Sequence, residues 1–288
     1  MMKYSVTTVS LPEMDLLEQV RFLSRLGYDG IEFRVRRNPE DAKAAASPSP
    51  WGFHRNDLSP DNLVKRASEV KRVLADHGLA LAGLGSYVKC TDLEEFKKVL
   101  EGAVAVGAPL MRVAAAAPFS KLDSDNYAAI YGETVAGYAR CLEFSRGSGV
   151  KLVLETHGGT IHTSASLALR ILSNFSPLDV GVIFDPNNMV SDGFETTGVV
   201  IQMLDDYIAH CHIAGHRPVA GEPDANGTVQ WKWECCSMAE GLYNFPEMLR
   251  WLKNIRYRNF ITVEDFRSNL SNEFKYQEAI DYLKKIER

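Results

Sequence analysis

The chain has 288 residues, with 32 Lys and Arg against 37 Asp and Glu, so its formal net charge is −5. Hydrophobic residues make up 45% and charged residues 24%, a globular mix that excludes disordered, collagen-like and coiled-coil chains. The mild acidity argues against a broad nucleic-acid-binding or membrane-binding surface. The most apolar stretch, 103–119, is interrupted by Gly107, Pro109 and Arg112, so we expect no segment to span a bilayer.

Five cysteines lie at scattered positions, and the first residues show no charged region followed by an apolar core. An odd, scattered set of cysteines is typical of reduced thiols rather than of a disulfide framework. Since no signal peptide is visible, we expect the protein to be cytoplasmic.

Apolar periodicity predicts short strands that alternate with amphipathic helices along the chain. We expect strands at 4–9, 30–35, 79–84, 110–116, 151–157, 180–185, 208–214 and 260–266. We expect helices at 11–26, 59–78, 92–106, 125–148, 164–174, 197–207, 245–254 and 272–287. Each strand is therefore followed by a helix, eight times in succession.

Strands that are separated by helical crossovers pair in parallel through right-handed connections. Eight such units fit an α/β fold with one (β/α)8 barrel over 1–288, both in length and in count. The competing architecture, a doubly wound open sheet, usually has a glycine-rich turn after its first strand, where this chain has Ser10-Leu11-Pro12-Glu13. In a barrel, the loops at the C-terminal ends of the strands build the active site.

Two of the expected loops at that end are long, at about 36–58 and 216–242. The first carries Trp51, and the second carries Trp231 and Trp233. Long structured loops over a barrel mouth are usually lids or substrate walls. The aromatic residues favour a wall that covers a small polar ring of the substrate. An incidental surface excursion is the alternative.

Four successive strands end an apolar run with ionisable side chains. These are Glu155, Asp185, the pair His210 and His212, and the pair Glu264 and Asp265. Converging carboxylates repel one another, and an unpaired buried charge costs several kcal/mol. A divalent cation resolves both problems. Oxygen-rich donors with one imidazole suit one Mn²⁺, Mg²⁺ or Co²⁺ ion, with Zn²⁺ and Fe²⁺ as alternatives.

The same strand ends carry a family resemblance. The motifs are LVLETH at 152–157, IFDPNNM at 183–189, HCHIAGH at 210–216, GLYNFPEML at 241–249 and FITVEDF at 260–266. In them the chain resembles the xylose-isomerase-like TIM barrel family, also called the sugar phosphate isomerase/epimerase superfamily. The resemblance extends over nearly the whole chain. It implies that Glu155, Asp185, His212 and Glu264 are the metal ligands and that His210 is buried beside them.

The resemblance also implies a reaction, because the two ligand glutamates of ketose epimerases in this superfamily are the acid and the base. Glu155 and Glu264 would then be catalytic, acting through an enediolate of a sugar, sugar phosphate or cyclitol. The chain departs from those epimerases at Asn188, where they carry His. It also lacks their Gly-Glu dipeptide after His212. We therefore do not expect a plain ketohexose 3-epimerase.

Other activities remain open on the same scaffold. A lyase or dehydratase acting on a keto-inositol, dehydroshikimate or a 3-keto glycoside would use the same proton abstraction. An endonuclease-IV-like phosphodiesterase needs a three-metal cluster with many His, Asp and Glu ligands and a basic DNA-binding face. Seven histidines and a net charge of −5 argue against both. A non-catalytic binding module is the third alternative. We expect a small polyhydroxylated substrate, no nucleic-acid or membrane partner, and a homodimer or homotetramer as in relatives.

Candidate substrate contacts lie around these strand ends. They are Glu32, Trp51, Arg112, His157, Asn188, His216 and Arg217. Arg34 and Arg36 share one face of their strand with Glu32, and arginines at the mouth can bind a phosphate, a carboxylate or a sugar hydroxyl. Internal salt bridges of Glu32 with Arg34 or Arg112 are the alternative, and His157 can equally be a structural histidine.

Overall fold

The structure, a computed structural model, describes residues 1–40, 47–120 and 122–288. Eight strands form a closed barrel in the order β1-β10-β7-β6-β5-β4-β3-β2. They are β1 Lys3–Thr7, β2 Gly30–Val35, β3 Ala80–Ser86, β4 Leu110–Arg112, β5 Lys151–Glu155, β6 Val180–Phe184, β7 Ile208–Ile213 and β10 Phe260–Val263. All neighbouring pairs are parallel, which confirms the (β/α)8 barrel.

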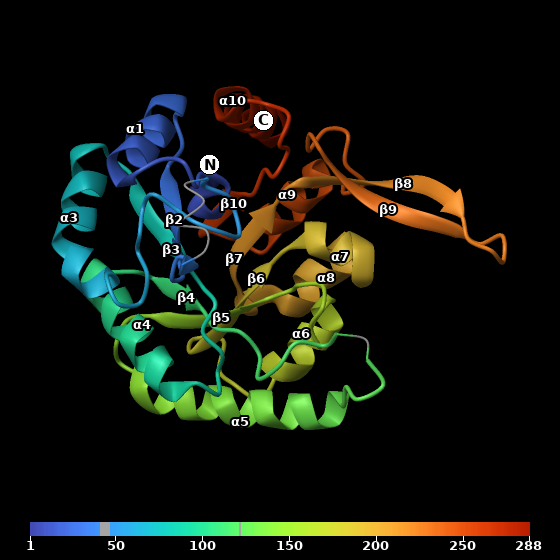
Figure 1. The fold of residues 1–288 in the computed structure, drawn as a ribbon, viewed down its shortest axis with the longest axis horizontal. Coiled ribbons are helices and arrows are strands. Elements are labelled where there is room, and N and C mark those ends of the chain that lie inside the picture. Colours follow the sequence, from blue (N-terminus) through green and yellow to red (C-terminus); the bar gives the residue numbers. More distant parts are fainter. Residues whose placement is uncertain (41–46, 121) are drawn as a thin grey trace.

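Helices cover the outside of the barrel, and the two chain ends lie close together (Figure 1). The helices between and after the strands are α1 Leu16–Leu26, α3 Leu63–Asp76, α4 Leu93–Val106, α5 Tyr127–Ser145, α6 Ala165–Leu172, α8 Thr197–Leu204, α9 Phe245–Asn254 and α10 Asn272–Glu287. The first helix begins later than expected because Asp15 and Glu18 form a capping box, in which each side chain accepts a hydrogen bond from the other residue's backbone N–H.

An additional short helix, α7 Pro186–Asp192, follows β6 directly and was missed in the sequence. Asp185 caps it by accepting hydrogen bonds from the backbone N–H groups of Asn187 and Asn188, and Pro186 occupies its first turn. Proline is favoured at that position because its missing N–H would have no partner there. A strand-end aspartate followed by proline was the available signal.

Residues expected as the loop 216–242 instead contain an antiparallel hairpin, β8 Gly215–Pro223 and β9 Val229–Cys236. The hairpin projects from the barrel as an arm (Figure 1). Trp231 and Trp233 lie on this arm with exposed fractions of 64% and 37%, so the wall expected from them over the polar ring is not what the structure shows. The overlooked signal was the Asn226-Gly227 dipeptide, which is typical of hairpin turns.

The described part of the loop 36–58 lies against the barrel mouth, whereas 41–46 fall outside the described residues. The Trp51 ring lies 5.3 Å from the Phe266 ring, just past β10. Arg34 in β2 donates a hydrogen bond from Nη2 to the Gly52 carbonyl at 3.1 Å. The loop is therefore in contact with β2 and with the segment that follows β10. Its role as a lid or substrate wall stays a prediction.

On the side of β5 and β6, the interior of the barrel is apolar below the mouth. Val153 and Ile183 are fully buried, and they precede Glu155 and Asp185 by two residues on the same strand faces. The carboxylates therefore stand on an apolar floor. All five cysteines are free thiols, and none of the helices in the described ranges combines the length and apolarity that a membrane crossing requires.

Helix α5 offers a matched pair of glycines that tests its packing. A Cβ at Gly137 would lie 2.6 Å from Cys90 Sγ and 2.9 Å from the Cys90 carbonyl oxygen, whereas one at Gly132 would meet nothing within 4 Å. We expect Gly137→Ala to lower the free energy of unfolding by about 1–3 kcal/mol through overpacking. Gly132→Ala should raise it by about 0.5–1 kcal/mol through helix propensity. Urea unfolding followed by circular dichroism measures both, and equal effects would contradict the close contact of α5 with Cys90.

Candidate metal centre

Four side chains meet at the C-terminal mouth of the barrel. Glu155 ends β5, Asp185 follows β6, His212 lies in β7, and Glu264 follows β10. One possible ligand atom from each lies within 4.8 Å of the others. His212 Nδ1 is 3.1 Å from Glu155 Oε1 and 3.4 Å from Glu264 Oε1. We call these four residues the ligand group, and parallel strands bring them together because all of them end at one mouth.

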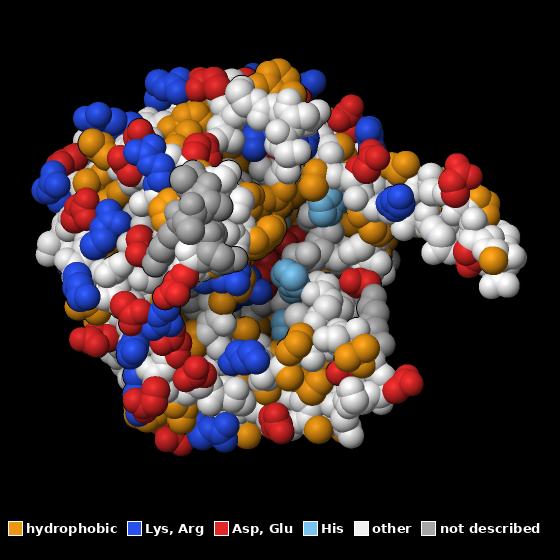
Figure 2. All heavy atoms as spheres, in the orientation of Figure 1, with side chains coloured by type: hydrophobic (Ala, Val, Ile, Leu, Met, Phe, Trp, Pro, Cys, Tyr) orange, Lys and Arg blue, Asp and Glu red, His pale blue; other side chains and the backbone are white. Residues whose placement is uncertain are grey.

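The mouth is hollowed on its outer face. Figure 2 shows this hollow with acidic side chains inside it and histidines along one side. Glu155, Asp185 and His212 are each no more than 3% exposed. Buried carboxylates at these distances are the pattern that a bound cation neutralises.

Asp185 is oriented by its own helix. Its Oδ1 accepts hydrogen bonds from the backbone N–H groups of Asn187 and Asn188 at 2.8 and 3.0 Å, and its Oδ2 accepts one from Asn188 Nδ2 at 2.5 Å. Asn188, expected as a substrate contact, thus contacts Asp185. The Thr156 hydroxyl accepts a hydrogen bond from the Asp185 backbone N–H at 2.9 Å, which links β5 to β6 at the site.

His212 is held from below by a second acidic residue. Glu32 Oε2 lies 3.0 Å from His212 Nε2 and 2.9 Å from His210 Nε2, and the Thr262 hydroxyl lies 2.7 Å from His210 Nε2. Glu32 was expected as a substrate contact, with a salt bridge to Arg34 or Arg112 as the alternative. Glu32 is 1% exposed and contacts the two histidines instead of either arginine. A carboxylate on the far nitrogen of an imidazole fixes its tautomer and orientation, as around metal-bound histidines.

The electrostatics of the ligand group separate its glutamates. Burial by itself would raise the pKa of Glu155, but the Arg112 guanidinium, 2.7 Å from Oε2, and His212 hold that pKa well below its usual range. Burial raises the pKa of Glu264 to about 8, with the charges of Glu155 and Asp185 adding to the effect and His212 opposing it. Burial together with the Glu155 charge raises the pKa of Asp185 to about 7.

The charge on His212 completes this balance. Burial would lower its pKa, but the charges of Glu32 and Glu264 and a hydrogen bond with Glu155 raise it well above its usual value. Without a cation, the group therefore retains protons near neutral pH. Three carboxylates and one imidazole that compensate in this way fit one divalent ion with a preference for oxygen ligands.

The remaining expected contacts lie in different places. Arg112 pairs with Glu155, as described above. His157 Nδ1 lies 2.6 Å from the Gly158 carbonyl oxygen. His216 Nε2 lies 3.3 Å from Cys235 Sγ at the base of the hairpin. Arg217, whose side chain is 48% exposed, lies on the arm and faces Glu234 at 3.5 Å, so the structure does not bring it to the ligand group.

A cavity of about 310 Å³ adjoins the ligand group on the side of β3 and β4. Glu155 and Arg112 line it together with Tyr87, Lys89, Thr160 and His162. His162 Nδ1 lies 2.7 Å from the Glu155 carbonyl oxygen, and burial lowers its pKa to about 4. Tyr87 and His162 were missed in the sequence. They lie in irregular segments, where no periodicity shows which way a side chain points.

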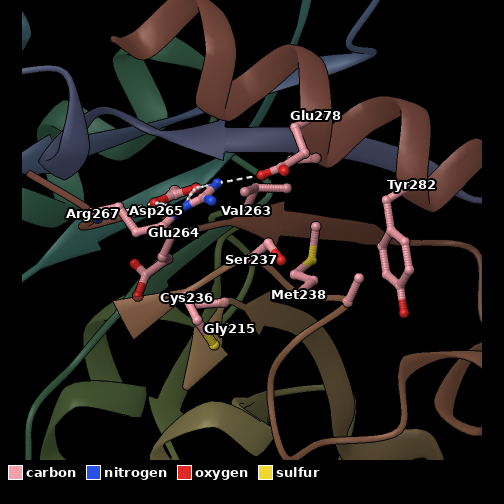
Figure 3. A pocket seen from close by; sticks show the side chains of 13 residues that line it. Gly215, Cys236, Ser237, Met238, Val263, Glu264, Asp265, Arg267, Glu278 and Tyr282 are labelled. Carbon is pink, nitrogen blue, oxygen red and sulfur yellow. Dashed lines mark hydrogen bonds and ion pairs between the residues drawn. The ribbon is translucent and has the colours of Figure 1, made fainter. Parts of the chain in front are cut away.

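A second, smaller cavity of about 100 Å³ lies behind Glu264, between the base of the hairpin, β10 and α10. Figure 3 shows that the Glu264 carboxylate points away from the ion pairs that Arg267 makes with Asp265 and Glu278. Glu264 therefore belongs to the ligand group, whereas Asp265 belongs to the packing of α10 against the barrel.

Comparison with known proteins gives a family model and several similar folds. The model, described as xylose isomerase-like TIM barrel, matches residues 20–286. By sequence, no curated protein matches the chain significantly.

Several solved structures share the fold. A 3-keto-D-glucoside 4-epimerase from E. coli has a TM-score of 0.72 at 16% identity, covering 99% of this chain and 100% of its own. A probable 3-DHS dehydratase of petrobactin synthesis from Bacillus anthracis has a TM-score of 0.72 at 17% identity, covering 98% and 99%. A D-psicose 3-epimerase has a TM-score of 0.73 at 14% identity, covering 99% of each chain. At these identities the likeness shows the fold alone.

The raised pKa values predict how metal binding depends on pH. His212, Asp185 and Glu264 must all lose a proton to bind a cation. The pKa values of Asp185 and Glu264 without it, about 7 and 8, place their loss near neutral pH, and the raised pKa of His212 adds to the same dependence. Mn²⁺ affinity should therefore rise as the pH increases from about 6 to 9, with proton release on binding. Calorimetry in buffers of different ionisation enthalpy measures both.

Two variants control this experiment. Asp185→Asn should weaken Mn²⁺ binding by more than the about 10- to 100-fold that is typical of outer-shell changes. Glu273→Gln removes an exposed carboxylate on α10 that pairs with Arg25, and it should leave Mn²⁺ binding unchanged. An affinity independent of pH, without proton release, would contradict the assignment.

Proposed function

Because the chain belongs to the xylose isomerase-like TIM barrel family, we propose that it is a divalent-metal-dependent isomerase or epimerase of a small polyhydroxylated substrate. The substrate class is a sugar, a sugar phosphate or a cyclitol. The observation that carries the proposal is the ligand group, in which Glu155 and Glu264 both approach His212 Nδ1, at 3.1 and 3.4 Å. Solved structures with this fold include sugar epimerases, which supports the same class of reaction.

The proposed metal is one Mn²⁺, Mg²⁺ or Co²⁺ ion held by Glu155, Asp185, His212 and Glu264, with Zn²⁺ and Fe²⁺ as alternatives. When bound, it supplies Lewis-acid polarisation of a carbonyl group and stabilises negative charge on oxygen. The rest of the chemistry belongs to the protein. Glu32 keeps the His212 ring in place, and Asn188 keeps the Asp185 carboxylate in place.

Glu155 and Glu264 act as the acid–base pair in this proposal. Arg112 and His212 keep Glu155 ionised, which suits the group that removes a proton from the carbon next to the carbonyl. The pKa of Glu264 is raised, which suits the group that holds a proton and returns it to the enediolate. Two carboxyl groups whose environments push their pKa values apart are the usual arrangement of an acid and a base.

A lyase or dehydratase is the second candidate function. One of the similar folds is a probable dehydratase, and Asn188 stands where ketose epimerases of the family carry histidine. The same proton abstraction then expels a leaving group from the next carbon. In the described residues, the two possible metal groups share His212 and form no three-metal cluster, so an endonuclease-IV-like activity gains no support.

The test is Glu264→Gln in Mg²⁺-loaded protein. This change keeps the size of the side chain and removes its ability to transfer a proton. We expect metal-dependent exchange of substrate C–H for deuterium to fall by about 10²- to 10⁴-fold, the usual contribution of a general acid or base. NMR on a panel of keto-sugars and cyclitols in D2O measures the exchange.

Glu278→Gln is the matched control, because Glu278 lies near Glu264 in the fold but pairs with Arg267. It should retain the wild-type rate. Mass spectrometry of the product separates the two functions, since an isomer has the mass of the substrate and a dehydration product is lighter by one water. A fully active Glu264→Gln variant would overturn the proposed mechanism.

A further inference from the structure

The side of the mouth formed by β2, β3 and β4 carries a set of cations. Arg36, just after β2, and Arg112, at the end of β4, lie against Tyr87. Lys89, after β3, lines a cavity together with Tyr87, and the charge of Arg34, in β2, acts on the Tyr87 hydroxyl. The guanidinium carbons of Arg36 and Arg112 lie 5.0 and 5.3 Å from the centre of the Tyr87 ring. We call these four cations and Tyr87 the Tyr87 cluster. Figure 2 shows Lys and Arg side chains along one side of the hollow.

Arg34 is the most telling member, because it is only 5% exposed and lacks an ion pair with any described residue. Its guanidinium has one hydrogen bond, from Nη2 to the Gly52 carbonyl, and its buried Nε has no partner within the described chain. Burial lowers its pKa to about 10, so it remains a cation at neutral pH. A buried guanidinium with unused donors is costly unless an anion joins it.

The other cations are also uncompensated. Arg36 and Lys89 are exposed, and neither forms an ion pair with a carboxylate of a described residue. Asp57, a carboxylate whose charge acts on Arg34, already accepts hydrogen bonds from the Ser59 backbone N–H and from Asn62 Nδ2. Only Arg112 has a carboxylate partner, and that partner, Glu155, belongs to the ligand group.

One cavity is lined by residues of both the Tyr87 cluster and the ligand group. The cavity of about 310 Å³ is lined by Tyr87, Lys89 and Arg112 as well as by Glu155. A molecule in this cavity can therefore contact Glu155 of the ligand group as well as Lys89 and Arg112. Arg34 and Arg36 do not line this cavity; they adjoin it through Tyr87. The size of the cavity is at the lower end of the range of small-molecule sites.

From this arrangement we infer that the substrate is an anion, whose carboxylate or phosphate binds the Tyr87 cluster while its carbonyl end lies at the ligand group. The placement of the carbonyl end at the ligand group rests on the proposed function. Guanidinium groups suit both anions, because their planar donors match carboxylate and phosphate oxygens. A neutral sugar would leave the buried Arg34 uncompensated. The substrate class is thus a keto-sugar acid or a sugar phosphate.

Binding of simple anions tests the Tyr87 cluster without any reaction. Inorganic phosphate and malonate are titrated into Mg²⁺-loaded protein by calorimetry at constant ionic strength. We expect saturable binding of at least one of them, weakened by about 10- to 100-fold in Arg34→Met and Arg36→Met, because hydrogen bonds to charged groups contribute at that level. Arg36 and Lys89 are exposed, so Arg36→Met and Lys89→Met keep the test valid if Arg34→Met does not fold.

Arg72→Met is the matched control, since Arg72 lies on α3, is 68% exposed and pairs with Asp76. It removes the same charge and should bind both anions as the wild type does. Absence of saturable binding, or binding that Arg34→Met and Arg36→Met leave intact, would overturn the inference.

Deuterium exchange then identifies the anion. The substrates are D-fructose, D-fructose 6-phosphate and 5-keto-D-gluconate, which differ in carrying no anion, a phosphate or a carboxylate. We expect one of the two anions to exchange faster than D-fructose by about 10- to 100-fold, and Arg36→Met to remove that preference. Anion binding without exchange on any substrate would support the cluster and overturn the reaction. Exchange on D-fructose alone, without anion binding, would support the reaction and overturn the inference.

Discussion

Repulsion between buried carboxylates at the mouth of the barrel is the constraint on which the rest of the site depends. Parallel strands bring Glu155, Asp185 and Glu264 to one place, where Glu155 and Asp185 are almost fully buried and water screens their charges little. Two cationic side chains compensate this negative charge. His212 lies between these carboxylates and Glu32, and Arg112 lies beside Glu155. The protons that Asp185 and Glu264 retain are the remaining part of the compensation.

The side chains of this site keep their positions because other residues hold them through hydrogen bonds and ion pairs. Asn188 and the first turn of α7 hold Asp185, and Glu32 holds both His210 and His212. These contacts fix the orientation of the ligand side chains, so that the carboxylates stay close together despite their like charge. They also explain why α7 begins directly at Asp185, since the end of the helix supplies the donors that the carboxylate needs.

The mouth is electrostatically divided, and this division connects the proposed reaction with the inferred substrate. Acidic residues occupy the ends of β5, β6 and β10. At β2, β3 and β4, Arg34 and Arg112 lie among the last residues of their strands, and Arg36 and Lys89 come just after theirs. A molecule in the cavity lined by Glu155, Lys89 and Arg112 contacts charges of both signs.

The sequence alone determined the barrel, because hydrophobic periodicity and eight strand–helix units admit few other topologies. It also determined which strands end in ionisable residues, since parallel strands share one mouth. It did not determine partners, because Glu32 has the same strand-face period whether it pairs with Arg34 or with His212. Only the closed barrel brings Glu32 to His210 and His212, across 180 residues in the case of His212. The tertiary structure likewise placed Tyr87 and His162 beside Glu155, because contacts between distant irregular segments leave no periodic trace in a sequence.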